Sequence, residues 1–259
     1  MIGIIGVGHI GEALISGFLS GGDLGNKLSI YDVNNQVLEK YINNDAVKIN
    51  VCNEDVVKNS EIIFLCVKPH QFKEVALELA GNLNKNQMII SVAPDFCLAS
   101  LQEMFSHQKV IRMMPSIMIQ IRRGVIAISK TDEVNETDSA KIQLLMQDMG
   151  YLYWTDELRI NQTIGVAGSG TAFAYQMIEA MGQGGVHNGL DAKEAYKMAA
   201  ETLIAAGEML LKTNEHPAKL RDHVCTPGGL TIQGIVKLEE LGFKHAVIEA
   251  VKATYQKEE

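Results

Sequence analysis

The feature that most constrains this chain is a glycine-rich turn directly after its first apolar segment. Residues 2–5 form a short run of strand-forming residues, and Gly6, Gly8 and Gly11 follow at G-x-G-x-x-G spacing. A segment of helical periodicity comes next, and a second apolar segment ends at Asp32, 21 positions after Gly11. This pattern of strand, turn, helix and strand with a closing acid is typical of the βαβ unit that binds dinucleotides.

The three glycines have different mechanical roles in such a unit. Gly6 allows the tight turn out of the strand, Gly8 lets a pyrophosphate approach bare backbone, and Gly11 lets the helix pack on the sheet. Asp32 would accept hydrogen bonds from the ribose hydroxyls of NAD and repel a 2′-phosphate, and residues 33–35 offer no cation for such a phosphate. We therefore expect NADH in preference to NADPH. The alternative is that Asp32 only caps a helix that begins near residue 35.

Composition excludes several classes of protein. The 259 residues leave room for two domains, and 47% hydrophobic with 21% charged residues are ordinary values for a folded chain. The net charge of −8, from 23 basic and 31 acidic residues without a basic run, argues against nucleic acid as a partner. No apolar run approaches the ~18 residues that span a bilayer, so no membrane partner is expected.

The cysteines and histidines show no redox or ligand spacing. The four cysteines are scattered without a C-x-x-C pair, and no secretion signal is recognisable, so reduced thiols and a cytoplasmic location are expected. The seven histidines show no H-E-x-x-H or similar spacing, so no metal site is expected.

Apolar strands and helical segments alternate through the first 158 residues. Ile62–Val67 is a fully apolar run, as in a parallel strand buried on both faces, and Pro69 is placed to begin the following helix. Further strands are expected at 47–49, 88–92, 109–113, 125–129 and 151–154, and helices at 35–44, 71–80 and 134–149. The alternation predicts a doubly wound, mainly parallel α/β domain of the Rossmann type over residues 1–158.

The composition changes after this region. No convincing strand follows residue 161, residues 170–181 are almost uniformly small or apolar, and residues 195–210 are apolar on more than one helical face. A domain of about 100 residues has too small a core to bury such helices. We therefore expect residues 159–259 to form an all-helical bundle completed by a second subunit, as a homodimer. The alternative is one unusually apolar helix inside a monomer.

A second candidate site lies between two of these helices. The segment Thr226-Pro227-Gly228-Gly229 breaks the preceding helix, and residues 230–241 read as a new one. The hydroxyls of Thr226 and Thr231, with backbone N–H groups from Gly229 to Thr231, would form an anion cradle at a helix N-terminus, suited to a carboxylate. The alternative is an ordinary corner between two helices.

Several motifs together resemble one family. Val67-Lys68-Pro69, Gly168-Ser169-Gly170, His216-Pro217-Ala218 and the segment Thr226–Thr231 follow the glycine-rich N-terminus in this order. The chain is similar over its whole length to pyrroline-5-carboxylate reductase, which forms proline. The resemblance implies an N-terminal Rossmann domain, an all-helical dimerisation domain, and dimers that often associate further into a decamer.

The resemblance also implies roles for individual residues. The carboxylate of a cyclic imino acid would lie against Thr226 and the N–H of Leu230, and Thr231 would hydrogen-bond the ring nitrogen. We expect Thr231, Thr226 and Lys68 to serve catalysis, Lys68 through its charge. The expected substrate-binding residues are Thr226, Gly228, Gly229, Leu230 and Thr231. The expected cofactor-binding residues are Gly6, Gly8, His9, Ile10, Gly11, Asp32, Val67, Lys68, Pro69, Ser91 and Ala93.

The chain departs from the family pattern in three places. The family's Met-Pro-Asn-Thr-Pro reads here as Met114-Pro115-Ser116-Ile117-Met118, and a small-residue stretch after it reads Ile121-Arg122-Arg123-Gly124. Gly168-Ser169-Gly170 is followed by Thr171-Ala172-Phe173 in place of Pro-Ala-Tyr. The leading expectation is NAD(P)H-dependent reduction of 1-pyrroline-5-carboxylate to proline. The alternatives are a reductase of another cyclic imino acid and a weakly catalytic, cofactor-binding regulatory paralogue.

Overall fold

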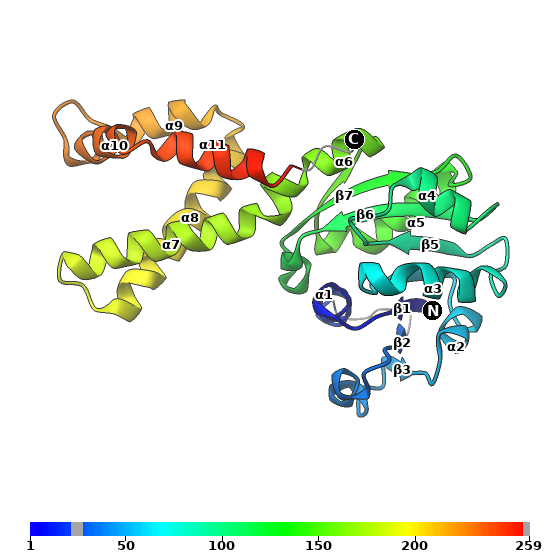
Figure 1. Ribbon diagram of the computed structural model, residues 1–259. Helices are drawn as coiled ribbons and strands as arrows, with labels where there is room; N and C mark the ends of the chain where they lie inside the picture. The colour runs from blue at the N-terminus through cyan, green and yellow to red at the C-terminus, as the bar shows by residue number, and fades with distance from the viewer. Residues whose placement is uncertain (22–27, 256–259) are drawn as a thin grey trace. The chain divides into compact units, whose positions relative to one another are not determined.

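The computed structural model describes residues 1–21 and 28–255, and these form two compact units, Met1–Gly168 and Ser169–Glu259. The first unit is an α/β domain, and the described part of the second is helical (Figure 1). The boundary between the two compact units falls after residue 168. The reason is that α6 (Glu157–Gln162) and the π-helical turn η5 (Ile164–Gly168) contact the sheet of the first unit. The boundary between functional domains after residue 158 stays a prediction.

The first unit is built on an eight-stranded sheet of order β3-β2-β1-β4-β5-β6-β7-β8. Neighbouring strands are parallel except β6 and β7, which pair antiparallel. The strands are β1 (Ile2–Ile5), β2 (Leu28–Tyr31), β3 (Val47–Ile49), β4 (Ile62–Leu65), β5 (Met88–Ser91), β6 (Lys109–Pro115), β7 (Gly124–Lys130) and β8 (Gly150–Trp154). The predicted doubly wound, mainly parallel sheet is thus confirmed, and β6 runs two residues beyond its expected end because its ladder with β7 continues to Pro115.

Two hydrophobic clusters cover the two faces of this sheet. Alternate residues of one strand point to opposite faces, so Phe64 belongs to one cluster and Ile63 to the other. The helices of the unit are α1 (His9–Leu19), α2 (Asn53–Lys58), α3 (Pro69–Ala80), α4 (Leu98–Met104), α5 (Glu136–Met146) and α6. Residues of α1 and α5 pack in the first cluster, and residues of α2, α3 and α4 pack in the second. Because both faces of the sheet are covered, β1 and β4 have no polar side chain along their length.

Two predicted helices are shorter than expected. The polar helix expected over residues 35–44 is instead two 3₁₀ turns, η1 (Asn35–Val37) and η2 (Glu39–Tyr41). Asparagines flank this stretch, and their side chains bond nearby backbone in competition with a regular helix; the side chain of Asn34, for example, accepts from the N–H of Gln36. The helix expected over 134–149 begins at Glu136, where Asn135 and Asp138 form a capping box, and it ends in the 3₁₀ turn η4 (Gln147–Met149).

The second unit consists of five helices in its described residues, and no strand occurs among them, as predicted. They are α7 (Gly170–His187), α8 (Ala192–Thr213), α9 (Pro217–Val224), α10 (Leu230–Glu240) and α11 (Phe243–Ala253). Helices α7 and α8 pack closely where Gly182 faces the ring of Tyr196; a Cβ on Gly182 would lie 2.3 Å from that ring. None of the described helices is both long enough and apolar enough to cross a membrane.

The second unit lacks a core of large side chains in its described residues. Its buried apolar residues there are Ala195 and Ala199, which are small. Large apolar side chains stay exposed on α8 and elsewhere: Ile204 is 56% exposed and Leu211 is 83% exposed. This apolar surface is what the sequence predicts for a helical unit that completes its core with another subunit.

Candidate functional site

The glycine-rich turn joins β1 to α1 with little room for side chains at two of its three glycines. Gly6 has φ +92°, and a Cβ there would lie 2.7 Å from the backbone of Cys66. A Cβ on Gly11 would lie 2.0 Å from the carbonyl oxygen of Gly6. Gly8 differs, because no atom lies within 4 Å of its Cβ position. Gly6 and Gly11 are therefore demanded by the fold, whereas the space beside Gly8 is left open, as a phosphate would need.

The N-terminus of α1 is arranged for an anion. Gly8 occupies the N-cap position, and no side chain caps the helix there. The N–H groups of the first turn have no acceptor within a helix, so they are available to a ligand. His9 and Ile10, two expected cofactor-binding residues, are the first residues of this turn.

Asp32 ties the end of β2 to the glycine-rich turn. Its Oδ2 accepts a hydrogen bond from the N–H of Val7 at 2.6 Å, and its Oδ1 accepts one from the N–H of Asn34 at 2.8 Å. The cap of the next helical turn is Asn34, so the alternative in which Asp32 merely caps that helix is wrong. The carboxylate borders the open cavity and also holds the turn in shape.

A cavity of about 340 Å³ lies at the carboxyl ends of β1, β2 and β4. Its lining includes five expected cofactor-binding residues: Gly6, Gly8, Asp32, Val67 and Lys68. The connections after β1 and β4 leave in opposite directions along the sheet, so this is the topological switch point at which doubly wound sheets bind ligands. The structure thus brings the glycine-rich turn, the acid and the Val67-Lys68 segment to one cavity.

The remaining expected cofactor residues continue along the same edge of the sheet. Pro69 is the first residue of α3, as predicted, and Ser91 is the buried last residue of β5. The hydroxyl of Ser91 accepts a hydrogen bond from the N–H of Ala93 at 3.3 Å.

The cavity also contains residues that sequence reasoning missed. Asn53, at the start of α2, and Gln71, on α3, line it, and the Asn53 amide donates to Glu78 at 2.8 Å. Both residues follow the carboxyl end of a strand, and that position is the signal that could have identified them. Cys66 lines it too, and burial raises the pKa of its thiol, so this side chain stays neutral and packs as an apolar group.

The segment predicted to form an anion cradle lies within a single turn of the second unit. Gly228 has φ +70°, which favours glycine, and Gly229 is the N-cap of α10, so Leu230 and Thr231 are its first two residues. The N–H of Gly229 donates to the carbonyl of Thr226 at 3.0 Å. The expectation that this N–H serves a carboxylate is therefore wrong, because the turn itself uses it. The N–H groups of Leu230 and Thr231, in the first helical turn, remain suited to an anion.

The segment that departs from the family pattern follows β6. Ser116 is buried, and its hydroxyl accepts a hydrogen bond from the N–H of Val125 at 3.0 Å. The next residues form the 3₁₀ helix η3 (Ile117–Ile121), which packs against α1 and ends at Arg122 with φ +59°. Ser116 therefore holds the β6–β7 connection together, and apolar side chains occupy the turn that follows it.

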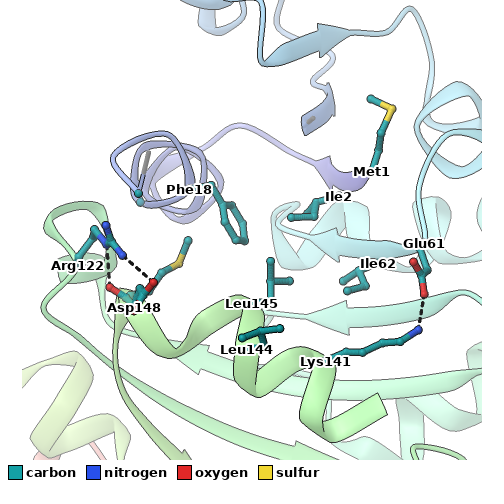
Figure 2. Close-up of a pocket in the computed structure, with 13 residues that line it drawn as sticks. Met1, Ile2, Phe18, Glu61, Ile62, Arg122, Lys141, Leu144, Leu145 and Asp148 are labelled. Atoms are coloured by element: carbon teal, nitrogen blue, oxygen red, sulfur yellow. Dashed lines mark hydrogen bonds and ion pairs between the residues drawn. The ribbon is translucent and has the colours of Figure 1, made fainter. Parts of the chain in front are cut away.

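A second cavity, of about 370 Å³, lies at the opposite edge of the sheet (Figure 2). Two ion pairs line it: Glu61 with Lys141 at 2.7 Å and Arg122 with Asp148 at 3.1 Å. The charges of this cavity are paired with one another, and the amino ends of the strands face it. The cavity at the carboxyl ends is therefore the one that matches the predicted dinucleotide site. Within residues 1–21 and 28–255, no group of three or more His, Cys, Asp or Glu side chains is arranged to hold a metal ion.

Comparisons with known proteins find matches for both parts of the chain. The family described as pyrroline-5-carboxylate reductase dimerisation matches residues 157–259, and the family described as NADP oxidoreductase coenzyme F420-dependent matches residues 1–95. The match of the C-terminal segment supports homo-oligomerisation, and the N-terminal match supports a nicotinamide cofactor.

Similar proteins cover the whole chain. Pyrroline-5-carboxylate reductase of Escherichia coli is 32% identical over 100% of this chain and 97% of that protein. Pyrroline-5-carboxylate reductase 3 of Xenopus laevis is 34% identical over 97% of this chain and 92% of that protein. A Plasmodium falciparum pyrroline carboxylate reductase, solved with NADP bound, has a TM-score of 0.88 at 25% identity and covers 98% of this chain and 94% of that chain. This chain therefore belongs to the pyrroline-5-carboxylate reductase family.

Proposed function

We propose that this chain reduces 1-pyrroline-5-carboxylate to L-proline, with NADH as the preferred reductant. The proposal rests on one observation: a chain that matches the family over its whole length has both an open glycine-rich turn at Gly8 and a first helical turn at Leu230 and Thr231 that suits a carboxylate. The first feature serves the cofactor and the second serves the substrate.

The preference for NADH rests on Asp32. Its carboxylate borders the cavity at the end of β2, where the adenosine ribose of a bound dinucleotide lies in this fold. A ribose with free hydroxyls can donate to this carboxylate, whereas a 2′-phosphate would be repelled. Val33 and Asn34, which also line the cavity, supply no positive charge to offset that repulsion.

The substrate is a cyclic imine with one carboxylate. Thr226 and the N–H of Leu230 would hold that carboxylate, and the hydroxyl of Thr231 would hydrogen-bond the ring nitrogen. A bound dihydronicotinamide supplies a hydride for the imine carbon, while the ring nitrogen carries a proton. Lys68, at the N-cap of α3, would add positive charge beside the cofactor. These side chains chiefly bind and orient, which agrees with the lack of an obvious catalytic acid or base.

The active form we propose is a homodimer joined through the C-terminal helices, with further association to a decamer. The large exposed side chains of α8, including Ile204 and Leu211, support this assembly because the described residues of the unit form no core of large apolar side chains that could bury them. A partner subunit would supply the missing apolar surface.

Ser116 bears on a second candidate function. Its hydroxyl is engaged with Val125, and it stands where the family pattern has an asparagine amide. A reductase acting on another cyclic imino acid would retain the carboxylate turn and change this segment. A weakly catalytic regulatory paralogue would also tolerate the change, but it would have no use for the Thr226–Thr231 turn.

The test is oxidation of NADH, beside NADPH, with pyrroline-5-carboxylate as substrate. We expect turnover that favours NADH, loss of most of it in Thr231→Ala, and its retention in Thr231→Ser, which keeps the hydroxyl. Absence of turnover while NADH still binds would overturn the proposal. A large rise in rate on Ser116→Asn would instead identify a reductase whose activity has decayed.

A further inference from the structure

A buried arginine that the proposed chemistry does not use lies beside the end of β5. Arg112, on β6, is 0% exposed, and in the sheet it stands opposite Ser91, the last residue of β5. Its Nη1 donates to Oε1 of Glu157, on α6, and its Nη2 donates to the carbonyl of Pro94 at 2.7 Å. The guanidinium therefore joins a sheet strand, a helix and the loop that follows β5.

That loop, residues 92–97, is held by this ion pair at two points, one within the loop and one directly after it. The guanidinium holds it at Pro94, and the carboxylate of Glu157 accepts from the N–H of Leu98, the first residue of α4, at 3.2 Å. Phe96 adds a third anchor, because its ring stacks on that of Phe72 with centroids 4.4 Å apart. The loop is thus fixed from β6, α6 and α3 together.

Arg112 and Glu157 are not arranged in the geometry that would make their ion pair strongest, although both side chains hold the 92–97 loop. Nε of Arg112 and Oε2 of Glu157 are buried and have no hydrogen-bond partner in the described residues. A bidentate contact would satisfy both atoms and is the stronger arrangement. Buried ion pairs in general contribute little net stability. Stability alone therefore does not account for a buried arginine that leaves its own Nε unsatisfied while it holds a loop carbonyl.

The position of the loop indicates which part of a ligand it meets. In a doubly wound sheet the two halves of a dinucleotide lie on the two sides of the switch point. Asp32 and the end of β2 mark the adenosine side, so the nicotinamide half extends over the ends of β4 and β5. The 92–97 loop follows β5 at that edge, and the N–H of Val92 bonds to the carbonyl of Leu65 at the end of β4.

We propose that Arg112 is a positioning residue, which with Glu157 fixes the 92–97 loop so that the nicotinamide half of the cofactor is held for hydride transfer. The inference rests on the proposed function for its cofactor. Arg112 and Glu157 do not line the cavity on the adenosine side, so substituting them should weaken binding of the nicotinamide half alone. A general loss of structure would weaken binding of both halves.

The test measures the two halves of the cofactor separately on the full chain. Calorimetry gives the dissociation constants of NADH and of ADP-ribose, which lacks the nicotinamide. The variants are Arg112→Met, which removes the charge at similar length, and Arg112→Lys, which keeps it. Lys109→Met is the matched control, because Lys109 is the first residue of the same strand and pairs with Asp138 at 2.8 Å.

In Arg112→Met we expect ADP-ribose to bind within about twofold of the wild type and NADH to bind about tenfold more weakly, the loss that one misplaced charged contact produces. Arg112→Lys should recover part of the NADH affinity, and Lys109→Met should bind both ligands like the wild type. The NADH oxidation rate should fall in Arg112→Met with little change in the KM for the imine.

Equal weakening of NADH and ADP-ribose, or no change in either, would overturn the inference. If Arg112→Met does not fold, the same ratio of affinities in Glu157→Gln and Arg112→Lys decides the matter. Because binding needs no imine, this ratio stays informative even if the chain does not turn over pyrroline-5-carboxylate.

Discussion

At the scale of single residues, we expect a substitution of Gly8 to affect ligand binding and a substitution of Gly11 to affect the stability of the fold. Gly8 has φ −75° and free space at its Cβ position, so Gly8→Ala fits the chain but places a methyl group where a pyrophosphate would approach. We expect an unchanged melting temperature and NADH binding weakened ~10-fold or more. In Gly11→Ala the methyl group meets the carbonyl of Gly6, and we expect ~3 kcal/mol of lost stability. Thermal unfolding and NADH fluorescence measure the two effects; a Gly8→Ala variant that binds NADH normally would contradict the assignment.

Asp32 gives a second prediction at this scale. Asp32→Asn keeps an oxygen that can accept from Val7 but removes the negative charge. We expect the ratio of kcat/KM for NADPH to that for NADH to rise about tenfold, since hydrogen bonds to charged groups are worth ~1.5–3 kcal/mol. Asp32→Ala should weaken binding of both cofactors, because the glycine-rich turn loses its tie to β2. A ratio that does not change in Asp32→Asn would remove this residue as the basis of cofactor choice.

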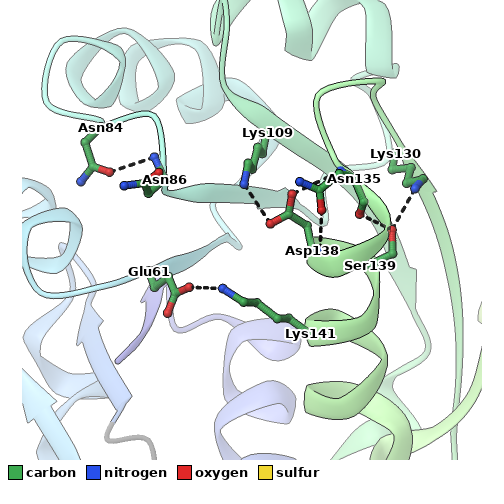
Figure 3. A network of polar contacts seen from close by, with 9 residues as sticks. All are labelled: Glu61, Asn84, Asn86, Lys109, Lys130, Asn135, Asp138, Ser139 and Lys141. Atoms are coloured by element: carbon green, nitrogen blue, oxygen red, sulfur yellow. Dashed lines mark hydrogen bonds and ion pairs between the residues drawn. The ribbon is translucent and has the colours of Figure 1, made fainter.

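At the scale of elements, a salt bridge joins α5 to the start of β4 (Figure 3). This salt bridge pairs Glu61 with Lys141. The hydrogen bond between the two side chains lowers the pKa of Glu61 and raises the pKa of Lys141. Both side chains are about half exposed, so we expect Lys141→Met to lose at most ~1 kcal/mol near neutral pH.

The pH dependence of that loss follows from the direction of each shift. A carboxylate with a lowered pKa in the fold stabilises fully above its unfolded pKa, and this contribution disappears as the pH falls through the lower, folded pKa. An amine with a raised pKa in the fold stabilises fully below its unfolded pKa, and this contribution disappears as the pH rises through the higher, folded pKa. The stability difference between wild type and Lys141→Met should therefore close at acid pH. Denaturant unfolding at several pH values, with a double-mutant cycle through Glu61→Gln, measures it; a constant difference would contradict the pairing.

At the scale of the whole molecule, the exposed apolar side chains of the second unit predict self-association. Ile204→Glu, on α8, puts a charge on this surface, and desolvating an unpaired charge opposes assembly. We expect the wild type to be an oligomer by light scattering and the variant to approach the 28.4 kDa of one chain. Ile42→Glu makes the same change at a 67% exposed isoleucine of the first unit and should leave the mass unchanged. A monomeric wild type would contradict the proposed dimer.

Much of the first unit could be predicted because its signals are local. Uninterrupted apolar runs such as Ile62–Leu65 occur where both faces of a strand are buried, and the glycine-rich turn records backbone geometry that few other residues allow. Pro69 marked the start of α3 for the same kind of local reason. The sequence by itself therefore determined the strands and the separation into an α/β part and a helical part.

Other properties depend on partners distant in the chain, and only the tertiary structure decided them. The N–H of Val7 meets the carboxylate of Asp32, and Arg112 meets Glu157 across 45 positions. The N–H of Gly229 is used within its own turn, and 3₁₀ turns replace the expected helix after Asp32. A hydrogen bond depends on which groups come within reach of each other in space, and periodicity along the chain does not contain that information. Residue types and spacing thus predicted where the two candidate sites lie, and three-dimensional contacts decided which backbone groups there are already engaged within the fold.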